Sequence, residues 1–189
     1  MLLRMLEKFS LYADIFTEKL AGFVNWLVLL MIITAVYNAF GRYAGKLIGV
    51  NLSSNFFLEI QWYLFSLVFL LGASSALAKN AHVRVDVFSS KFSSKTRAKI
   101  DFAGGLVLLL PFCIFIIVIS FPSVISSWSV FEQSPDPGGI VRYPIKTVLP
   151  AAFIILFLQG ISEMIKAWFL MKGIRAENLP DDSVKRGVV

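Results

Sequence analysis

Ionisable side chains that could do chemistry within an apolar environment are scarce in this sequence. Glu59 opens a long apolar run, and Glu163 and Lys166 lie three positions apart near the end of another. On a helix, side chains at that spacing are neighbours, so either an ion pair or extension of the lysine towards the membrane interface accounts for Glu163 and Lys166. For Glu59 two interpretations stay open: a carboxylate placed favourably near a helix N-terminus that Asn55 caps, and a contact with another subunit.

Metal, haem and nucleophile chemistry all lack their usual ligands here. The only histidine is His82, whereas a haem held between membrane helices by two histidines needs a second one. The single cysteine, Cys113, excludes an internal disulfide, and no cluster of His, Cys, Asp and Glu has the spacing of a zinc or di-iron site. Glycine-rich phosphate loops and nucleophile elbows are absent too. We therefore expect no enzyme activity, no catalytic residues, no metal and no cofactor.

The composition is that of a membrane protein. Hydrophobic residues make up 57% of the 189 residues and charged residues 16%, whereas a soluble domain has about 45–50% apolar residues. Four apolar runs exceed the roughly 20 helical residues that cross the hydrocarbon core. They cover residues 20–40, 56–78, 102–125 and 145–171. Because the runs lack the two-residue period of barrel strands, we expect an all-α integral membrane protein of one domain, 1–189, with four transmembrane helices.

Lysine and arginine are distributed unevenly among the segments that flank these runs. Of the 18 such residues, 14 lie in the N-terminal segment, in the connection between the second and third runs, and at the C-terminal end. Cytoplasmic segments of membrane proteins carry such an excess. We therefore predict that both termini and the middle connection are cytoplasmic, and the net charge of +6 needs no nucleic acid to explain it.

Two amphipathic patterns lie outside the runs. Within residues 1–19 and at the start of the first run, apolar side chains recur in steps of four and three, at Leu2, Leu6, Phe9, Ala13, Phe16 and Leu20. This predicts an amphipathic N-terminal helix that lies at the membrane interface or packs on a neighbouring helix. The middle connection has a weaker pattern, and Ser93 or Ser94 is expected to cap the helix of the third span. Residues 172–189 are typical of a solvated cytoplasmic tail.

Polar and aromatic residues elsewhere leave similar alternatives. Asn25, Asn38 and Gln159 are amide side chains within the runs, and such groups more often join helices than move substrates. In the connection between the third and fourth runs, two prolines and two glycines within residues 135–139 predict a turn. The aromatic residues around it fit a membrane interface or a contact with an external partner.

The stretch from Glu59 to Asp86 carries a more specific pattern. The glutamate that opens the second span is followed by Trp62, a small-residue patch (GASSA, 72–76), Lys79 and the sequence HVRVD at 82–86. With the four-span layout, the chain length and the last span (LPAAFIILFLQGISEMIKAW), it resembles the small membrane subunit, DctQ or Q, of tripartite ATP-independent periplasmic (TRAP) transporters. The family often has arginine at the position of Lys79. The lysine is a departure from the family pattern, because an ammonium group does not replace a planar guanidinium.

The resemblance implies a three-part importer in the bacterial inner membrane. In that family a periplasmic substrate-binding protein captures an organic anion, and a large membrane subunit carries it inward with sodium. The small subunit binds the large one as part of a static scaffold, without a substrate or ion site. The implied partners are therefore the large TRAP membrane subunit, the binding protein and membrane lipids. Two other functions stay open: a self-contained small carrier or channel, which the apolar span centres disfavour, and a membrane-assembly protein unrelated to transport.

Three sets of residues are candidate contacts under this interpretation. A cytoplasmic corner is expected to contact another subunit or lipid headgroups through Lys79, His82, Arg84 and Asp86. Small side chains are expected to permit close helix packing at Gly72, Ala73 and Ala76. Outward-facing residues are expected to contact the binding protein at Glu59, Trp128, Asp136 and Arg142.

Overall fold

The structure, a computed structural model, describes residues 2–49, 54–79 and 92–174, and every regular element in these ranges is helical. The elements are α1 (Leu2–Ile48), α2 (Asn55–Ala78), α4 (Ser94–Gly104), the π-helical turn η1 (Gly105–Leu109), α5 (Leu110–Ser129) and α6 (Tyr143–Lys172). Four helices are long and apolar enough to cross a membrane, the third being the continuous Lys95–Ser129. This confirms the expected all-α fold with four membrane-spanning helices.

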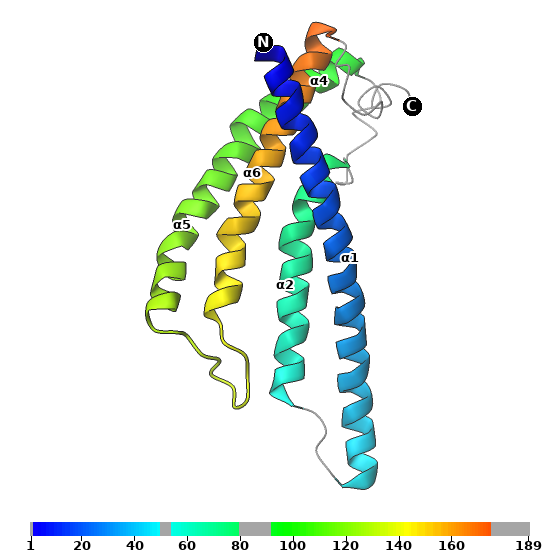
Figure 1. The fold of residues 1–189 in the computed structure, drawn as a ribbon, viewed down its shortest axis with the longest axis vertical. Coiled ribbons are helices and arrows are strands. Elements are labelled where there is room, and N and C mark those ends of the chain that lie inside the picture. Colours follow the sequence, from blue (N-terminus) through cyan, green and yellow to red (C-terminus); the bar gives the residue numbers. More distant parts are fainter. Residues whose placement is uncertain (1, 50–53, 80–91, 175–189) are drawn as a thin grey trace.

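The helices form two pairs (Figure 1). Helix α1 packs along α2, and α5 packs along α6. Helix α6 also contacts α1, α2 and α4, so it links the two pairs. The N-terminal part of α1 crosses α6 at the end of the molecule where α4 also lies.

Helix α1 is a single helix of 47 residues and joins the two segments, 1–19 and 20–40, that the sequence suggested as separate elements. No proline interrupts it, and at 1.5 Å per residue it is about 70 Å long, more than twice the ~30 Å hydrocarbon core. Its N-terminal part packs on a neighbouring helix, one of the two expected arrangements. However, the apolar stripe is covered only in part, since Leu2 is 71% and Phe16 54% exposed. The other stripe residues are exposed at Phe9 and half-buried at Leu6, Ala13 and Leu20, whereas Ser10 and Thr17 are buried.

Local sequence explains where the other helices end and change register. Ser93 caps α4 as expected, because its hydroxyl accepts a hydrogen bond from the Thr96 N–H at 3.3 Å. In η1 the Leu110 N–H bonds to the Gly105 carbonyl, five residues back, directly before Pro111, which has no N–H to donate. Helix α6 ends at Gly173, whose φ of 66° is the left-handed conformation that glycine adopts without steric cost.

Candidate functional site

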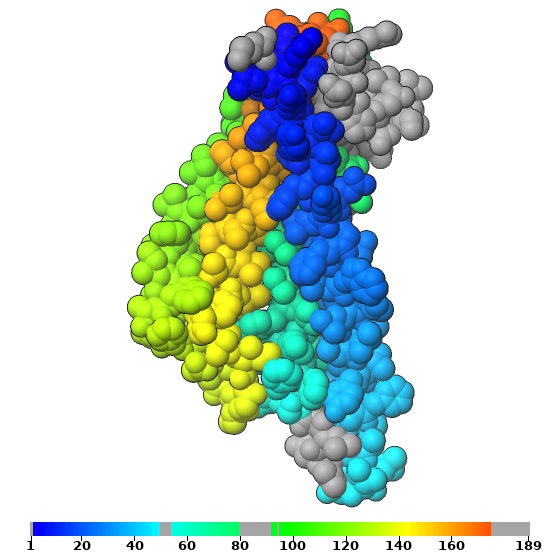
Figure 2. Space-filling view, viewed as in Figure 1, coloured from blue at the N-terminus to red at the C-terminus, as the bar shows by residue number. Residues whose placement is uncertain are grey.

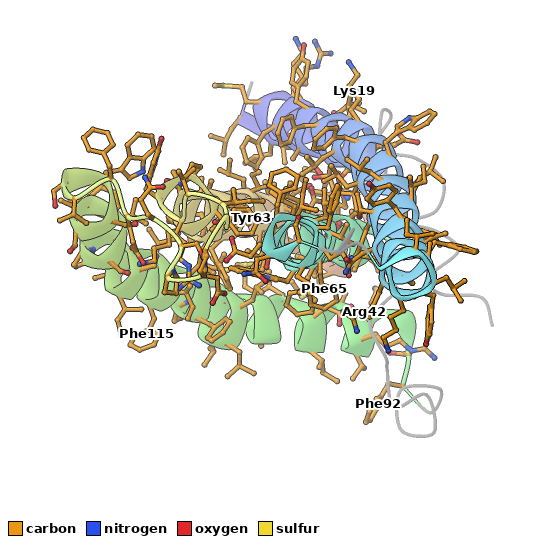
Figure 3. All side chains as sticks on the ribbon, turned by 90° about the horizontal axis from the view of Figure 1, so that it is seen from below. Lys19, Arg42, Tyr63, Phe65, Phe92 and Phe115 are labelled. Carbon is orange, nitrogen blue, oxygen red and sulfur yellow. The ribbon has the colours of Figure 1, made fainter. Side chains whose placement is uncertain are left out.

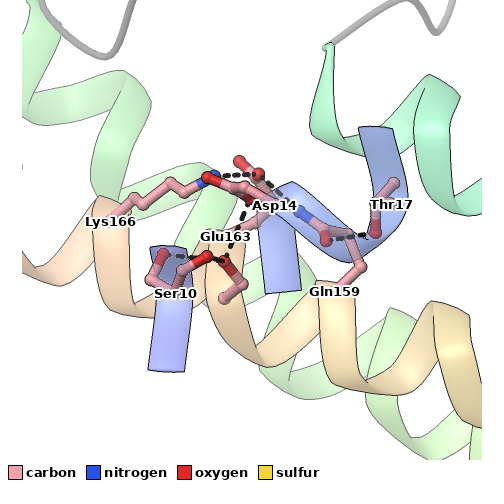
Figure 4. A network of polar contacts seen from close by, with 7 residues as sticks. Ser10, Asp14, Thr17, Gln159, Glu163 and Lys166 are labelled. Atoms are coloured by element: carbon pink, nitrogen blue, oxygen red, sulfur yellow. Dashed lines mark hydrogen bonds and ion pairs between the residues drawn. The ribbon is translucent and has the colours of Figure 1, made fainter. Parts of the chain in front are cut away.

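Lys166 is the centre of a polar cluster that joins α1 to α6 (Figure 4). Its ammonium nitrogen lies 2.7 Å from the Asp14 carboxylate and 2.8 Å from the Glu163 carboxylate. Only 8% of Lys166 is exposed. The predicted ion pair of Glu163 with Lys166 is confirmed, and Asp14 from the far end of the chain is a second partner. A buried ammonium group is thereby neutralised and hydrogen-bonded, which burial of a charge requires.

Uncharged groups complete this arrangement, which we call the N-terminal cluster: Ser10, Asp14, Thr17, Gln159, Ser162, Glu163 and Lys166. The Thr17 hydroxyl donates to the Gln159 side-chain oxygen at 2.8 Å, and the Gln159 amide donates to Asp14 at 2.9 Å. The hydroxyls of Ser10 and Ser162 lie 2.7 Å apart. Gln159 therefore joins helices, as its residue type indicated.

The spacing of these residues explains why they meet. Ser10, Asp14 and Thr17 follow one another by four and three positions, so they share one face of α1. On α6 the cluster residues follow the same periodicity, from Gln159 to Lys166. This polar stripe was not predicted, although it recurs with the same periodicity as the apolar stripe of residues 1–19.

A second cluster holds the α5–α6 loop, residues 130–142, against the start of α2. Asn55, Glu59 and Tyr63 are spaced by four, which places them on one face of α2. The Asn55 amide donates to the Pro137 carbonyl at 3.0 Å, and the Tyr63 hydroxyl donates to the Val141 carbonyl at 2.5 Å. In Figure 3, which looks along the bundle from one end, Tyr63 lies towards the middle, whereas Lys19 and Phe115 project outward.

Glu59 is the buried centre of this loop cluster, with 3% of its surface exposed. One carboxylate oxygen accepts a hydrogen bond from the Ser134 hydroxyl, and the other accepts one from the Ile140 N–H. Both oxygens are thus occupied by the same chain. The Ser54 N-cap makes no side-chain cap bond, and Asn55 bonds to the loop instead.

The predicted turn at 135–139 is present and shapes the Glu59 contact. The Gly139 N–H bonds to the Asp136 carbonyl at 3.0 Å, and Gly138 has a φ of 73°. A Cβ atom on Gly139 would lie 2.5 Å from the Ser134 Cβ and 2.6 Å from a Glu59 carboxylate oxygen. Only glycine therefore lets the loop approach Glu59 this closely.

Glu132 fastens the other side of the loop. Its carboxylate accepts hydrogen bonds from the Lys146 ammonium and, at 2.6 Å, from the Ser127 hydroxyl, and its carbonyl accepts the Arg142 N–H at 2.8 Å. The Lys146 hydrogen bond, followed by that of Ser127, holds the pKa of the Glu132 carboxyl below its ordinary value. The Arg142 guanidinium lies 5.9 Å from the centroid of the Trp62 ring, a cation–π distance.

Aromatic side chains stand beside the loop cluster. The Trp128 and Tyr143 rings are 4.5 Å apart, and the Phe131 and Tyr143 rings 5.8 Å apart. Trp128 is 44% exposed and its indole N–H donates to the Thr147 hydroxyl at 2.8 Å. An apolar body with one hydrogen-bonded polar end suits a membrane interface as well as a protein contact.

Two of the other expected contact residues lie on the surface of the described ranges. Asp136 is exposed in the turn, Lys79 is exposed at the end of α2, and His82, Arg84 and Asp86 lie outside the described residues.

The small-residue patch lies on α2. Gly72 faces α1, but a Cβ there would lie 3.9 Å from Val24, an ordinary contact, and Ala73 and Ala76 are half-buried. Closer approaches occur at Gly105 and Gly160, where a Cβ would lie 2.8 Å from Met164 and 2.9 Å from Leu109. The packing of α5 and η1 on α6 therefore depends more on glycine than the packing of α1 on α2.

The two clusters have one chemical property in common: the charged groups at their centres are bound by groups of the same chain. Lys166 is held by two carboxylates, Glu59 by loop donors, and Glu132 by Lys146 and Ser127. Arg142 differs, because its Nε is buried and has no hydrogen-bond partner in the described residues. Within residues 2–49, 54–79 and 92–174, no group of three or more His, Cys, Asp and Glu side chains is arranged to hold a metal ion. The contacts of the two clusters join α1 to α6 and α2 to the α5–α6 loop.

Comparison with known protein families gives a match over most of the chain. The sequence model of the family described as "Tripartite ATP-independent periplasmic transporters, DctQ component" matches residues 31–170, which is more than half of the chain. A search of the curated proteins found no match.

Proposed function

Since this chain belongs to the family of DctQ components of tripartite ATP-independent periplasmic transporters, we propose that it is a non-catalytic scaffold subunit of such a transporter. A membrane component of this kind is a multi-pass protein of the inner membrane, and the chain has four helices able to span it. The scaffold role means that the subunit supplies a fixed frame while another subunit carries the substrate.

The observation that carries this proposal is the pair of polar clusters at opposite ends of the helix bundle. The N-terminal cluster ties α1 to α6 through Lys166, Asp14 and Gln159. The loop cluster ties α2 to the α5–α6 connection through Glu59 and Tyr63. Each helix pair is therefore fastened to the other at both ends. A carrier that alternates between two shapes must break such contacts in every cycle, whereas a static frame keeps them.

The finer features of the function rest on the family resemblance. We propose that the chain binds the large membrane subunit and serves the import of an organic anion driven by a sodium gradient. With the termini in the cytoplasm, the α5–α6 loop faces the binding protein. Trp128, Asp136 and Arg142 then remain the contact candidates, because Glu59 is occupied within the chain. Lys79, His82, Arg84 and Asp86 are proposed contacts of the cytoplasmic corner.

Reconstitution tests the scaffold role against a self-contained carrier. The chain alone, the chain with its large membrane subunit, and the large subunit alone are placed in proteoliposomes, each with the cognate binding protein and its substrate. We expect sodium-driven uptake only where the large subunit and this chain are both present. Uptake by this chain without a large subunit would replace the scaffold role with a carrier role. A chain that co-purifies with no large membrane protein would favour the membrane-assembly alternative.

A further inference from the structure

Helix α1 has an outward face that differs from an ordinary lipid-facing surface. Opposite the buried face, a stripe of exposed residues recurs in steps of four and three. We call it the α1 stripe; it consists of Glu18, Gly22, Asn25, Leu29 and Ile32. Figure 2 shows that α1 lies on the surface of the molecule along its length. Among the described residues, the stripe therefore belongs to a helix that its neighbours cover on one side only.

Asn25 gives the α1 stripe its significance. It lies within the first predicted span, and its side chain is exposed. No side chain or backbone group of residues 2–49, 54–79 or 92–174 hydrogen-bonds its amide. Hydrocarbon offers neither donors nor acceptors, so an amide facing lipid loses the hydrogen bonds that water or protein would supply. A protein partner with a donor or acceptor removes that cost.

Gly22 supplies a second and independent feature, one turn from Asn25. A Cβ atom at Gly22 would meet nothing within 4 Å. Glycine is therefore not needed there for the packing or the backbone conformation of this chain, and it weakens an exposed helix relative to alanine. Small residues on a membrane helix do, however, let a second helix approach closely. Gly22 therefore leaves space for a second helix next to the Asn25 amide.

We propose that the α1 stripe is a docking face for a transmembrane helix of another membrane component of the same transporter, with a polar side chain opposite Asn25. The inference rests on the proposed function, which requires such a component, and adds the face that binds it. Lipid chains are a suitable environment for the apolar residues of the stripe, Leu29 and Ile32, which are 46% and 52% exposed. They offer no hydrogen bond to the amide of Asn25.

Two substitutions test the docking face without changing contacts inside the chain. Asn25→Leu removes the amide, and Gly22→Leu fills the space that a partner helix would occupy. Gly104→Leu is the matched control, because a Cβ at Gly104 also meets nothing within 4 Å. The large membrane subunit that co-purifies with each variant in mild detergent is measured as a fraction of that retained by the wild type. We expect a loss of about tenfold for Asn25→Leu and Gly22→Leu, and less than about twofold for Gly104→Leu.

The outcomes separate this proposal from the scaffold role. If the wild-type chain retains no large subunit, the proposed function fails. If the wild type retains it and Asn25→Leu and Gly22→Leu retain it equally well, the docking face is wrong while the scaffold role stands. If the purified chain alone is a dimer that Gly22→Leu converts to a monomer, a second copy occupies the stripe and the proposal is overturned. Equal thermal unfolding midpoints of the three isolated variants are the check on folding.

Discussion

The hydroxyl oxygens of Ser10 and Ser162 lie 2.7 Å apart, although the two residues are separated by 152 positions in the chain. Ser10 belongs to the first turns of α1 and Ser162 to the second half of α6. Their contact fixes the N-terminal part of α1 against the helix that links both pairs. The same face of α1 carries Asp14, so the fixed position also brings a carboxylate to Lys166.

Lys166→Met should destabilise the chain strongly. The substitution leaves the carboxylates of Asp14 and Glu163 close together without their shared cation, and breaking a buried ion pair in this way costs about 3 kcal/mol or more. Unfolding in mixed micelles of dodecyl maltoside and SDS measures the change in free energy. Lys19→Met is the control, since Lys19 is an exposed lysine of α1. Equal stability of the two variants would show that the N-terminal cluster does not hold α1 on α6.

Gly139→Ala should loosen the loop cluster, whereas Gly72→Ala should be tolerated. An added methyl group at Gly139 overlaps Ser134 and Glu59, while at Gly72 it makes an ordinary contact with Val24. Overpacking of a close contact costs about 1–3 kcal/mol. The same micelle titration compares the two variants. A larger loss for Gly72→Ala would mean that the small-residue patch of α2, and not the loop, depends on close packing.

Phe131 occupies a backbone conformation that favours glycine. It lies two residues after the end of α5, its φ is 46°, and its N–H bonds to the Trp128 carbonyl at 3.3 Å. Phe131→Gly and Phe131→Ala both remove the ring contact with Tyr143, so the difference between them isolates the backbone. We expect the glycine variant to be more stable than the alanine variant by about 1 kcal/mol. An alanine variant that is equally stable would indicate that the loop leaves this conformation once the ring is gone.

Acid should weaken the loop through Glu132. Its pKa is lowered in the folded chain, so its contribution to stability is present above the ordinary carboxyl pKa of 4.5 and is lost as the pH falls through the lower, folded value. The thermal unfolding midpoint is measured from about pH 6 down to about pH 3.5. Glu132→Gln should be less stable than the wild type at the upper end and should show a smaller decrease towards the lower end. If the unfolding midpoints of the two proteins fell in parallel with pH, Glu132 would not contribute to the loss of stability in acid.

Much of the fold could be predicted from the sequence, because the lipid core imposes one simple requirement on apolar helices. Run lengths above about 20 residues were enough to identify the four spanning helices. Ser93 as a cap and the turn at 135–139 followed from residue types with strong local preferences. The ion pair of Glu163 with Lys166 was one of the two arrangements that helical spacing indicated.

The parts that could not be predicted depend on contacts between distant segments. Asp14 contacts Lys166 only because α1 crosses α6. The residue pattern within one helix does not predict which other helix it crosses. The burial of Glu59 likewise depends on a loop some 80 residues further along the chain. In the N-terminal segment, the apolar stripe did not reveal the fully buried positions, Ser10 and Thr17, because in a membrane protein apolar side chains also face outward.

The most direct test of a static scaffold is a reversible cross-link between Ser10 and Ser162. Both are replaced by cysteine, and the complete transporter is assayed for uptake in proteoliposomes after oxidation and again after reduction. The single variant Ser10→Cys is the control for oxidation itself. The account predicts that uptake by the cross-linked transporter equals that of the reduced one, because α1 and α6 keep their contact throughout transport. Uptake that stops when the disulfide forms and returns when it is reduced would contradict the account, since it would show that these two helices must separate in each cycle.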